Sequence, residues 1–383
     1  MMTASHYFSS RPLWGDEELV LKNIQAPGYS SIFAKFVEPQ LFPRVQLTVV
    51  KFIAAHFNNN VWSLRFISFI TMLTAFWVWI PVFKRLKDPH LIWLAVLSFV
   101  ASFRLVYYAS ELKPYAMDVV SSGLFCWFLL YVSEQGDRVQ NFAALKPTTN
   151  NQQPTTGALY LMLGACLLPL LLFWSYGAFF LFWLVPVQFF LLSLKDKKWR
   201  PYLWASVASS VLCFIIFYFI DLRFSLNIHA TYDYWDSYFI STHSVKDFFA
   251  TFFDGTRKLV AFWFGNTKAF IRLGTPLIPI FVIGLFYNGI KDWQANKIAI
   301  SSVMVIALVI FTELFLFGIF RKYPFTGERI TLFFAPLVFY VLIKTLDGMK
   351  KIRLLGTVCM IYYVGFCFFS LINTAVFFVR TFR

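Results

Sequence analysis

Charged residues are scarce in this chain of 383 residues: they fill 14% of its positions, against about 25% in a soluble domain. Hydrophobic residues make up 59% and aromatic residues 21%, with 49 phenylalanines among them. A chain with so few charges must place most of its length in lipid rather than in water. We therefore expect an all-α polytopic membrane protein.

Cysteine frameworks, repeats and nucleotide-binding signals are lacking as well. All five cysteines lie inside apolar runs, where they behave as small hydrophobes rather than as a disulfide or metal-binding framework. The sequence has no internal repeat, heptad pattern or glycine-rich phosphate loop. The net charge of +15 comes from basic residues scattered over short loops, which is typical of membrane topology, so we expect no nucleic-acid partner.

Apolar stretches of the length needed to cross about 30 Å of hydrocarbon recur along the chain. Ser175-Tyr176-Gly177 separates two of them and should be the turn of a tight helical hairpin. The segment 133–157, rich in Asn, Gln, Thr and Pro, should be a solvated loop. We predict a bundle of about ten transmembrane helices, near 66–84, 90–108, 115–132, 158–174, 177–194, 202–220, 275–290, 298–320, 330–346 and 354–378.

Basic residues gather in alternate loops between these stretches, and the positive-inside rule places such loops in the cytoplasm. They are Lys84, Arg85, Lys87, Lys195, Lys197, Lys198, Arg200, Lys291, Lys297, Lys350, Lys351 and Arg353. The C-terminus and the remaining loops should then lie outside. Those loops are 1–65, 109–114, 175–177, 221–274 and 321–329.

The chain divides into two parts on this topology. Residues 1–65 form an outer loop with amphipathic interfacial helices, and residues 66–383 form the transmembrane bundle. The bundle includes the large outer loop 221–274, whose aromatic and polar residues suit an interfacial surface. Because residues 1–13 contain no apolar helix or signal segment, we expect one further transmembrane helix upstream of Met1.

Acidic residues mark the first of three outer-face clusters. Asp16 and Glu17 open a short amphipathic segment, where acids near hydrocarbon are costly and so point to function. The same acids could be ordinary residues of a helical first turn. In the second cluster, Glu111, Lys113 and Tyr115 join two spans. Glu111 and Lys113 could also be an interfacial pair that reaches from the membrane to water.

The third cluster is the hairpin 321–329, in which three cations stand on the side that the topology rule disfavours. Arg321, Lys322 and Arg329 accompany a single acid, Glu328. A bound anion explains this excess of positive charge better than topology does. These residues are therefore candidates for contact with a phosphate.

Four sequence segments, taken in order, resemble the bacterial GT-C superfamily of glycosyltransferases, and in particular its aminoarabinose transferase and protein mannosyltransferase-like branch. They are Trp14-Gly15-Asp16-Glu17, then Leu64-Arg65-Phe66-Ile67-Ser68, then Glu111-Leu112-Lys113-Pro114-Tyr115, and then Tyr-Pro-Phe-Thr-Gly-Glu-Arg-Ile-Thr-Leu-Phe at 323–333. Together they cover nearly the whole chain in order and spacing. The resemblance implies a GT-C-like bundle.

The resemblance also implies an activity: transfer of a sugar from a polyprenyl-phosphate-linked donor to a glycan, lipid or protein acceptor at the outer face of a bacterial cytoplasmic membrane. It implies Asp16 as the catalytic base, with Glu17 in support. The expected substrate-binding residues are Arg65, Glu111, Lys113, Tyr115, Arg321, Lys322, Glu328 and Arg329. Lys113 stands where the family often has arginine, so it would act on phosphate as a point charge.

Three questions stay open at the level of sequence. A divalent cation on Asp16, Glu17 or Glu111 is compatible with the chemistry, although no His or Cys cluster demands one. A lipid or sugar transporter or flippase is the main alternative function, supported by Glu313 inside an apolar stretch. An O-antigen ligase or polymerase is a third, although loop 221–274 has few arginines for that class.

Overall fold

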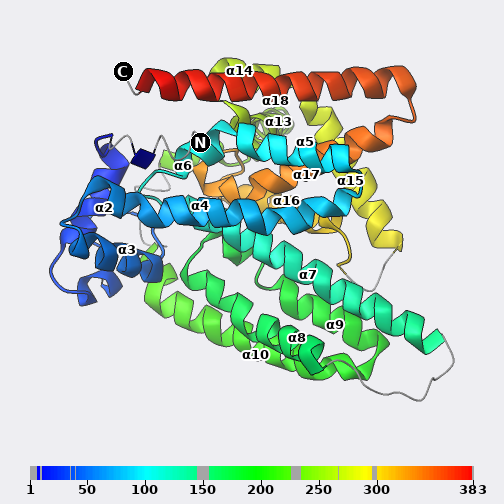
Figure 1. The fold of residues 1–383 in the computed structure, drawn as a ribbon, viewed down its shortest axis with the longest axis horizontal. Helices are drawn as coiled ribbons and strands as arrows, with labels where there is room; N and C mark the ends of the chain where they lie inside the picture. The colour runs from blue at the N-terminus through cyan, green and yellow to red at the C-terminus, as the bar shows by residue number, and fades with distance from the viewer. Residues whose placement is uncertain are drawn as a thin grey trace.

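The computed structural model describes residues 7–8, 11–34, 36–38, 40–144, 155–225, 234–265, 267–295 and 300–381, so Lys297 lies outside the described residues. Helices and short helical turns (η) account for nearly all regular structure in these ranges (Figure 1). In chain order they are α2 (Gly15–Gln25), η1 (Ser30–Phe33), α3 (Arg44–His56), α4 (Val61–Phe83), η2 (Lys84–Leu86), α5 (Pro89–Ala101), α6 (Phe103–Tyr108), α7 (Tyr115–Ala144), α8 (Thr155–Leu167), η3 (Leu168–Phe173), η4 (Gly177–Phe180), α9 (Leu184–Lys195), η5 (Lys197–Trp199), α10 (Arg200–Phe217), η6 (Tyr218–Leu222), α11 (Arg223–Ser225), η7 (Asp236–Tyr238), α13 (Val245–Ala261), η8 (Phe262–Phe264), α14 (Lys268–Leu273), α15 (Leu277–Ala295), α16 (Val303–Ile319), η9 (Arg329–Phe334), α17 (Ala335–Met349) and α18 (Arg353–Thr381).

Six helical segments of the described chain are long and apolar enough to cross a membrane. They are Val61–Leu86, Tyr115–Gly136, Gly177–Lys195, Lys197–Leu222, Arg329–Met349 and Arg353–Arg380. Three shorter apolar helices, Pro89–Ala101, Gly157–Phe173 and Val303–Ile319, lie at three further predicted spans, and α15 lies at the remaining one. The protein is thus an all-helical membrane protein, as the composition predicts.

Two predicted boundaries are wrong. The apolar stretch 90–108 is two helices, because Ser102 adopts an extended backbone and its hydroxyl caps the next helix by accepting from the Leu105 amide. Hydropathy alone does not register such a break. Helix α7 continues to Ala144, although residues from 133 onward were expected in a loop, because a polar composition does not prevent a helix from extending beyond the bilayer.

The segment from α2 to α3 has a small hydrophobic core of its own. Helix α2 carries Asp16 and Glu17 in its first turn, which confirms the short helix expected there. Its inward residues Val20 and Ile24 pack with α3, the start of α4 and the turn after α6. This core consists of Val20, Ile24, Ile32, Phe42, Leu47, Val50, Ala54, Leu64 and Leu112.

Helix α4 links the two ends of the bundle and packs closely on α7. The Trp79 indole donates to the Val119 carbonyl at 2.9 Å, and a Cβ at Gly123 would lie 2.9 Å from the Trp79 indole nitrogen. Glycine at 123 therefore permits the close approach. We call the end with α2 and α3 the site end. The opposite end, with the α4–α5 and α17–α18 connections, is the basic end; α18 runs back from it toward the side of α2 and α3 (Figure 1).

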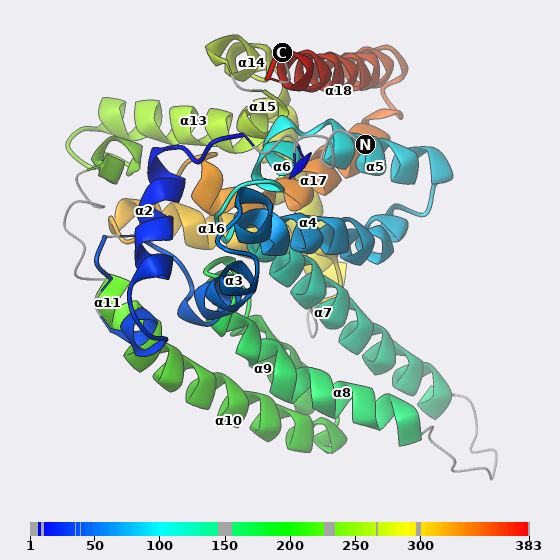
Figure 2. The ribbon, with the colours of Figure 1, turned by 60° about the vertical axis from the view of Figure 1, so that its left-hand side comes forward.

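The predicted hairpin turn at Ser175-Tyr176-Gly177 is confirmed. It separates α8 and η3 from η4 and α9, and Figure 2 shows α8, α9 and α10 together on one flank of the bundle. Asp118 of α7 holds the turn, because its carboxylate accepts from the Ser175 hydroxyl at 2.7 Å and from the Gly177 amide at 3.1 Å. Asp118 thus serves helix packing.

We predict that the two ends face opposite sides of the membrane, with the basic end in the cytoplasm. Single cysteines at Val37 and Ile352, both exposed, report the site end and the basic end respectively. In intact cells of a strain with an opened outer membrane, a membrane-impermeant maleimide should label Val37→Cys. It should label Ile352→Cys only after the inner membrane is permeabilised. The cysteine-free parent is the control, and the reverse labelling pattern would overturn the topology.

Candidate active site around Asp16, Lys113 and Arg329

Helix α2 is attached to the bundle by a buried ion pair between Glu17 and Arg65. The Arg65 guanidinium donates to the two carboxylate oxygens of Glu17 at 2.9 and 2.6 Å, and neither side chain is exposed to solvent. The Leu112 amide donates to the same carboxylate at 2.7 Å. Arg65 also donates to the carbonyl of Arg11 at 2.9 Å. Glu17 and Arg65 therefore fix α2, α4 and the turn 109–114 relative to one another.

Asp16 faces a different side of α2 and meets two cations from distant parts of the sequence. Its carboxylate forms ion pairs with Arg329, at the start of η9, and with the Lys113 ammonium at 3.7 Å. The Asp16 side chain is 25% exposed, whereas that of Lys113 is 3% exposed. The structure thus brings together three residues that the sequence singled out in three separate segments, in a cluster that solvent reaches at Asp16.

Lys113 is buried in a polar environment at the edge of this cluster. Its ammonium donates to the Gln40 side-chain oxygen at 2.8 Å. Burial lowers the pKa of Lys113 to about 8, Asp16 opposes that shift, and the positive charge of Arg329 adds to it. The lysine is therefore charged below this pH and loses its proton as the pH rises through it.

Glu111 lies beside the cluster with a different set of partners. Its carboxylate accepts from the Arg11 guanidinium and from the Trp14 indole, each at 2.9 Å. Burial raises the pKa of Glu111, and the nearby negative charge of Glu17 raises it further, whereas Arg11 lowers it. The hydrogen bond from Trp14 links the start of α2 to the turn 109–114.

Tyr115 opens α7 next to the same group of charges. Its side chain is buried and packs edge-on against Tyr108 with ring centroids 5.2 Å apart. It interacts electrostatically with Arg329 and Asp16. Tyr115 thus forms part of the buried wall behind the charged cluster.

The hairpin 321–329 divides its charged residues between two places. Arg321 adopts a left-handed backbone with a φ of 53° and forms an ion pair with Asp236, while Lys322 is exposed. Their contact with an anion stays a prediction. Glu328 lies further in, where burial raises its pKa and the charge of Arg104 opposes the shift. Only Arg329 of this hairpin reaches Asp16 in the described contacts.

Three residues of the site were not predicted from the sequence: Arg104, Gln40 and Arg11, the partner of Glu111. Arg104 of α6 stacks on Phe262, with its guanidinium carbon 4.0 Å from the ring centroid, and interacts with Glu328. An arginine inside an apolar stretch was the signal that could have found it. Gln40, the partner of Lys113, lies in an irregular segment without any such signal.

A second buried network joins α3 to α10 and also went unrecognised. Arg44 lies between the rings of Phe36 and Phe224, 4.2 and 4.4 Å from their centroids. Its backbone amide donates to the Asp221 carboxylate at 3.0 Å, and the Tyr176 hydroxyl donates to the same group at 2.7 Å. Asp221 lies in the π-turn η6, so this network connects the site end to the flank formed by α8–α10.

The three acids proposed for a metal are held by different cations. Asp16 is paired with Arg329 and Lys113, Glu17 with Arg65, and Glu111 with Arg11. In the ranges that the structure describes, no three His, Cys, Asp or Glu side chains form a group that could hold a metal ion. Each of the three carboxylates therefore has its own cationic partner.

Comparison with known proteins identifies similar structures but no sequence family. No family model and no curated protein matches the sequence. The crystal structure of ArnT from Cupriavidus metallidurans in the apo state aligns with a TM-score of 0.47 at 12% identity, over 90% of this chain and 57% of that one. The structure of the same protein bound to undecaprenyl phosphate aligns with a TM-score of 0.48 at 14% identity, over 98% of this chain and 70% of that one. The chain thus spans little more than half the length of the apo ArnT chain it resembles.

Proposed function

We propose that this protein is a membrane glycosyltransferase that moves a sugar from a polyprenyl-phosphate-linked donor to an acceptor hydroxyl at the outer face of the membrane. The observation that carries the proposal is the cluster of Asp16, Lys113 and Arg329, which holds one carboxylate and two cations at the site end of an all-helical membrane protein. The phosphate of a donor requires positive charge to bind it, and a reacting hydroxyl requires a carboxylate that takes its proton.

The two cations suit the phosphate of the donor. In the free protein Asp16 neutralises them, as the ion pairs describe. A donor phosphate that contacts Arg329 and Lys113 takes over this neutralisation and releases the Asp16 carboxylate. Binding of the donor thereby prepares the base for the acceptor, because a carboxylate freed from its cations accepts a proton more readily.

The transfer then balances without a further reagent. The acceptor oxygen forms a bond to the anomeric carbon of the sugar, and the bond from that carbon to the phosphate oxygen breaks. Asp16 takes the hydroxyl proton, and polyprenyl phosphate leaves with the electron pair, held by Arg329 and Lys113. Glu17 and Arg65 position α2 during the step, because their buried ion pair joins α2 to α4 and the Leu112 amide donates to the same carboxylate.

The test is whether the sugar–phosphate bond is broken. The full-length protein in liposomes should consume a polyprenyl-phosphate sugar labelled in the sugar and release polyprenyl phosphate when a suitable acceptor is present. A transporter would move the labelled lipid across the membrane with this bond intact. Translocation without cleavage would refute the transferase.

Asp16→Asn should lower turnover by roughly 10²–10⁴, the usual contribution of a general base, because the amide cannot take the acceptor proton. Donor binding should persist. Turnover and donor affinity of the purified full-length variant provide the measurement. An unchanged rate would show that Asp16 is not the base and would move attention to Glu111.

Glu17→Gln and Glu18→Gln are the matched comparisons. Glu18 is exposed on the same turn, so its variant should behave as the parent. Glu17→Gln leaves the Arg65 guanidinium buried without its counter-charge, which costs about 3–5 kcal/mol of stability. Its main effect should therefore appear in the melting temperature. A large loss of turnover in a Glu17→Gln protein of normal stability would instead make Glu17 a reacting group.

Arg329→Ala should weaken donor binding by about 1.5–3 kcal/mol, the contribution of a hydrogen bond to a charged group. The control is Arg257→Ala, which removes a partly exposed arginine whose ion-pair partner is Asp254. Binding of polyprenyl phosphate to both variants can be followed by titration in detergent. Equal affinities in the parent and in a folded Arg329→Ala protein would contradict the phosphate contact.

Donor binding should weaken as the pH rises through about 8, because Lys113 loses its charge there. A polyprenyl-phosphate sugar is a phosphodiester and does not titrate in this range, so the change must come from the protein. In Lys113→Arg the loss should disappear, since the guanidinium stays protonated to a pH above about 12. Donor dissociation constants from pH 7 to pH 9.5 test this, and an identical pH profile in Lys113→Arg would exclude Lys113 as the cause.

Transport of a lipid or sugar is the second candidate function, and Glu313 is the observation in its favour. This carboxylic acid lies within the apolar helix α16, is partly buried and hydrogen-bonds with Trp183. Acids inside membrane helices often mark a transport pathway. Glu313→Gln should leave sugar transfer unchanged if the protein is a transferase, and should abolish translocation if it is a transporter.

A further inference from the structure

A cavity of about 480 Å³ lies at the basic end of the bundle, between α5 and α18. It is separate from the charged cluster, which contains no residue of these two helices. Its lining residues are His90, Leu91, Trp93, Leu94, Leu97, Lys350, Met360 and Val364. Its size is in the range of cavities that hold small ligands, about 300–1,000 Å³.

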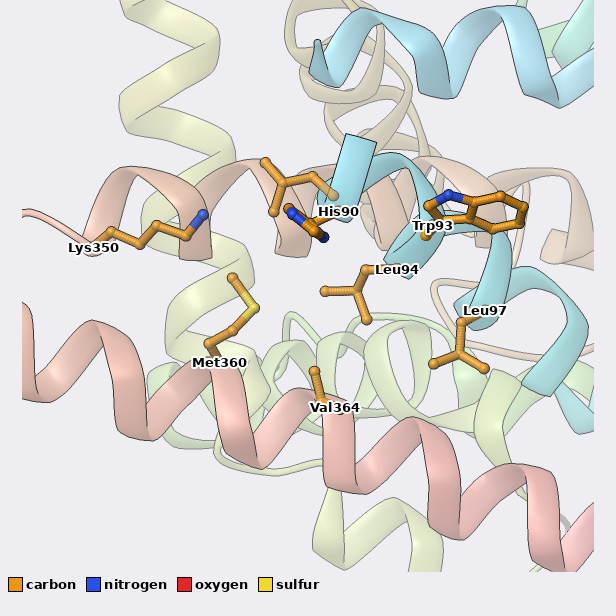
Figure 3. Close-up of a pocket in the computed structure, with 8 residues that line it drawn as sticks. His90, Trp93, Leu94, Leu97, Lys350, Met360 and Val364 are labelled. Carbon is orange, nitrogen blue, oxygen red and sulfur yellow. The ribbon is translucent and has the colours of Figure 1, made fainter. Parts of the chain in front are cut away.

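The cavity is polar at one end and apolar along its length. Figure 3 shows the Lys350 side chain, at the end of α17, extending toward His90. Leu94 and Leu97 on α5 face Met360 and Val364 on α18 in the same view. Such a combination fits a ligand with a polar head and a hydrocarbon chain.

The charge around the polar end favours an anionic head. The α4–α5 connection and the α17–α18 junction carry Lys84, Arg85, Lys87, Lys350, Lys351 and Arg353, and the acids there are Asp88 and, in the last turn of α17, Asp347. The Lys350 ammonium lies 3.0 Å from Asp347 and 3.8 Å from Asp88, yet its side chain remains 49% exposed. Cations therefore remain in excess where the cavity opens.

The apolar walls decide which anion fits. Trp93 is 71% exposed, and Leu97, Met360 and Val364 are partly exposed, so these lining residues offer apolar surface to a ligand, whereas Leu91 and Leu94 are almost covered by protein. Free phosphate would leave these walls without contacts, and a zwitterionic lipid would bring an ammonium group toward Lys350. Basic pockets between transmembrane helices are known to bind anionic headgroups. An acyl chain with an anionic phosphate satisfies both parts of the cavity.

We propose that this cavity binds one anionic glycerophospholipid, with its phosphate at Lys350 and His90 and an acyl chain between α5 and α18. The lipid then lies along two helices that already meet through buried polar groups, since the Ser98 and Tyr363 hydroxyls are 2.8 Å apart and the Ser370 hydroxyl donates to the Ala101 carbonyl at 2.6 Å. Helix α5 leads directly into α6, which carries Arg104, so the lipid supports the helix behind the charged cluster. The site does not depend on the proposed transferase activity.

Native mass spectrometry of the purified, delipidated protein in detergent tests the headgroup. One phosphatidylglycerol molecule should bind more tightly than phosphatidylethanolamine of the same acyl chains. Lys350→Gln should weaken phosphatidylglycerol binding by about fivefold, the effect of one cation near a charged lipid. Lys351→Gln, which removes a charge from the same connection outside the cavity, should leave it unchanged.

A filled cavity tests the position of the acyl chain. Val364→Trp places a large side chain inside the cavity and should abolish the tight site, whereas Ile361→Trp on the exposed face of α18 should not. The melting temperature of each variant, measured without added lipid, shows that it is folded. If Val364→Trp unfolds, the comparison of Lys350→Gln with Lys351→Gln still tests whether the anionic headgroup binds at this cavity.

Three results would overturn the proposal. Equal binding of phosphatidylglycerol and phosphatidylethanolamine would show that the headgroup is not recognised. Equal weakening by Lys350→Gln and Lys351→Gln would reduce the effect to the general charge of this end. Competition by inorganic phosphate at the affinity of the lipid would show a phosphate site without a role for the acyl chain.

Discussion

The Arg65 guanidinium and the Glu17 carboxylate meet where neither side chain reaches solvent, and the arrangement of the site depends on this contact. A charge removed from water is costly unless an opposite charge and hydrogen bonds compensate it, so each partner requires the other. The pair joins α2 to α4, and the Leu112 amide adds the turn before α7. One ion pair thus positions three segments that are distant in sequence.

The position of Asp16 follows from this contact. Neighbouring residues of an α-helix point about 100° apart, so a helix that turns Glu17 inward must turn Asp16 toward the side. There the carboxylate meets Lys113, from the turn before α7, and Arg329, from the hairpin before η9. Burial of Lys113 lowers its pKa to about 8, which makes its charge responsive to moderately alkaline conditions. Two adjacent acids consequently have different environments: Glu17 is enclosed by protein, and Asp16 is partly open.

Charge is distributed over the bundle in two contrasting ways. At the site end, acids and bases from separate segments pair with one another, and the few buried cations lie next to carboxylates. At the basic end, cations of short connections outnumber acids and border an apolar cavity. The ion pairs of the site end hold charged groups in a fixed geometry, which a catalytic site requires. The basic end leaves positive charge exposed, as contact with a membrane surface requires.

The sequence by itself determined the membrane class, the approximate places of the helices and the three segments that carry charged residues. Each of these depends on local composition, which hydropathy and spacing report directly. It did not determine the break at Ser102 or the full length of α7, because a single cap or a polar extension hardly changes hydropathy. Composition and spacing did not distinguish Asp16 from Glu17, since both are acids in one helical turn, and only the family resemblance gave them different roles.

Only the tertiary structure decided which charges meet. Arg329 and Arg321 belong to one hairpin, but the first reaches Asp16 and the second pairs with Asp236. Gln40 and Arg104 join the site through contacts with residues far away in the chain. Spacing in sequence does not report such contacts, because they depend on how α2, α6 and η9 pack against α7. The physical reason is that an ion pair is set by three-dimensional distance and burial, and both arise from packing.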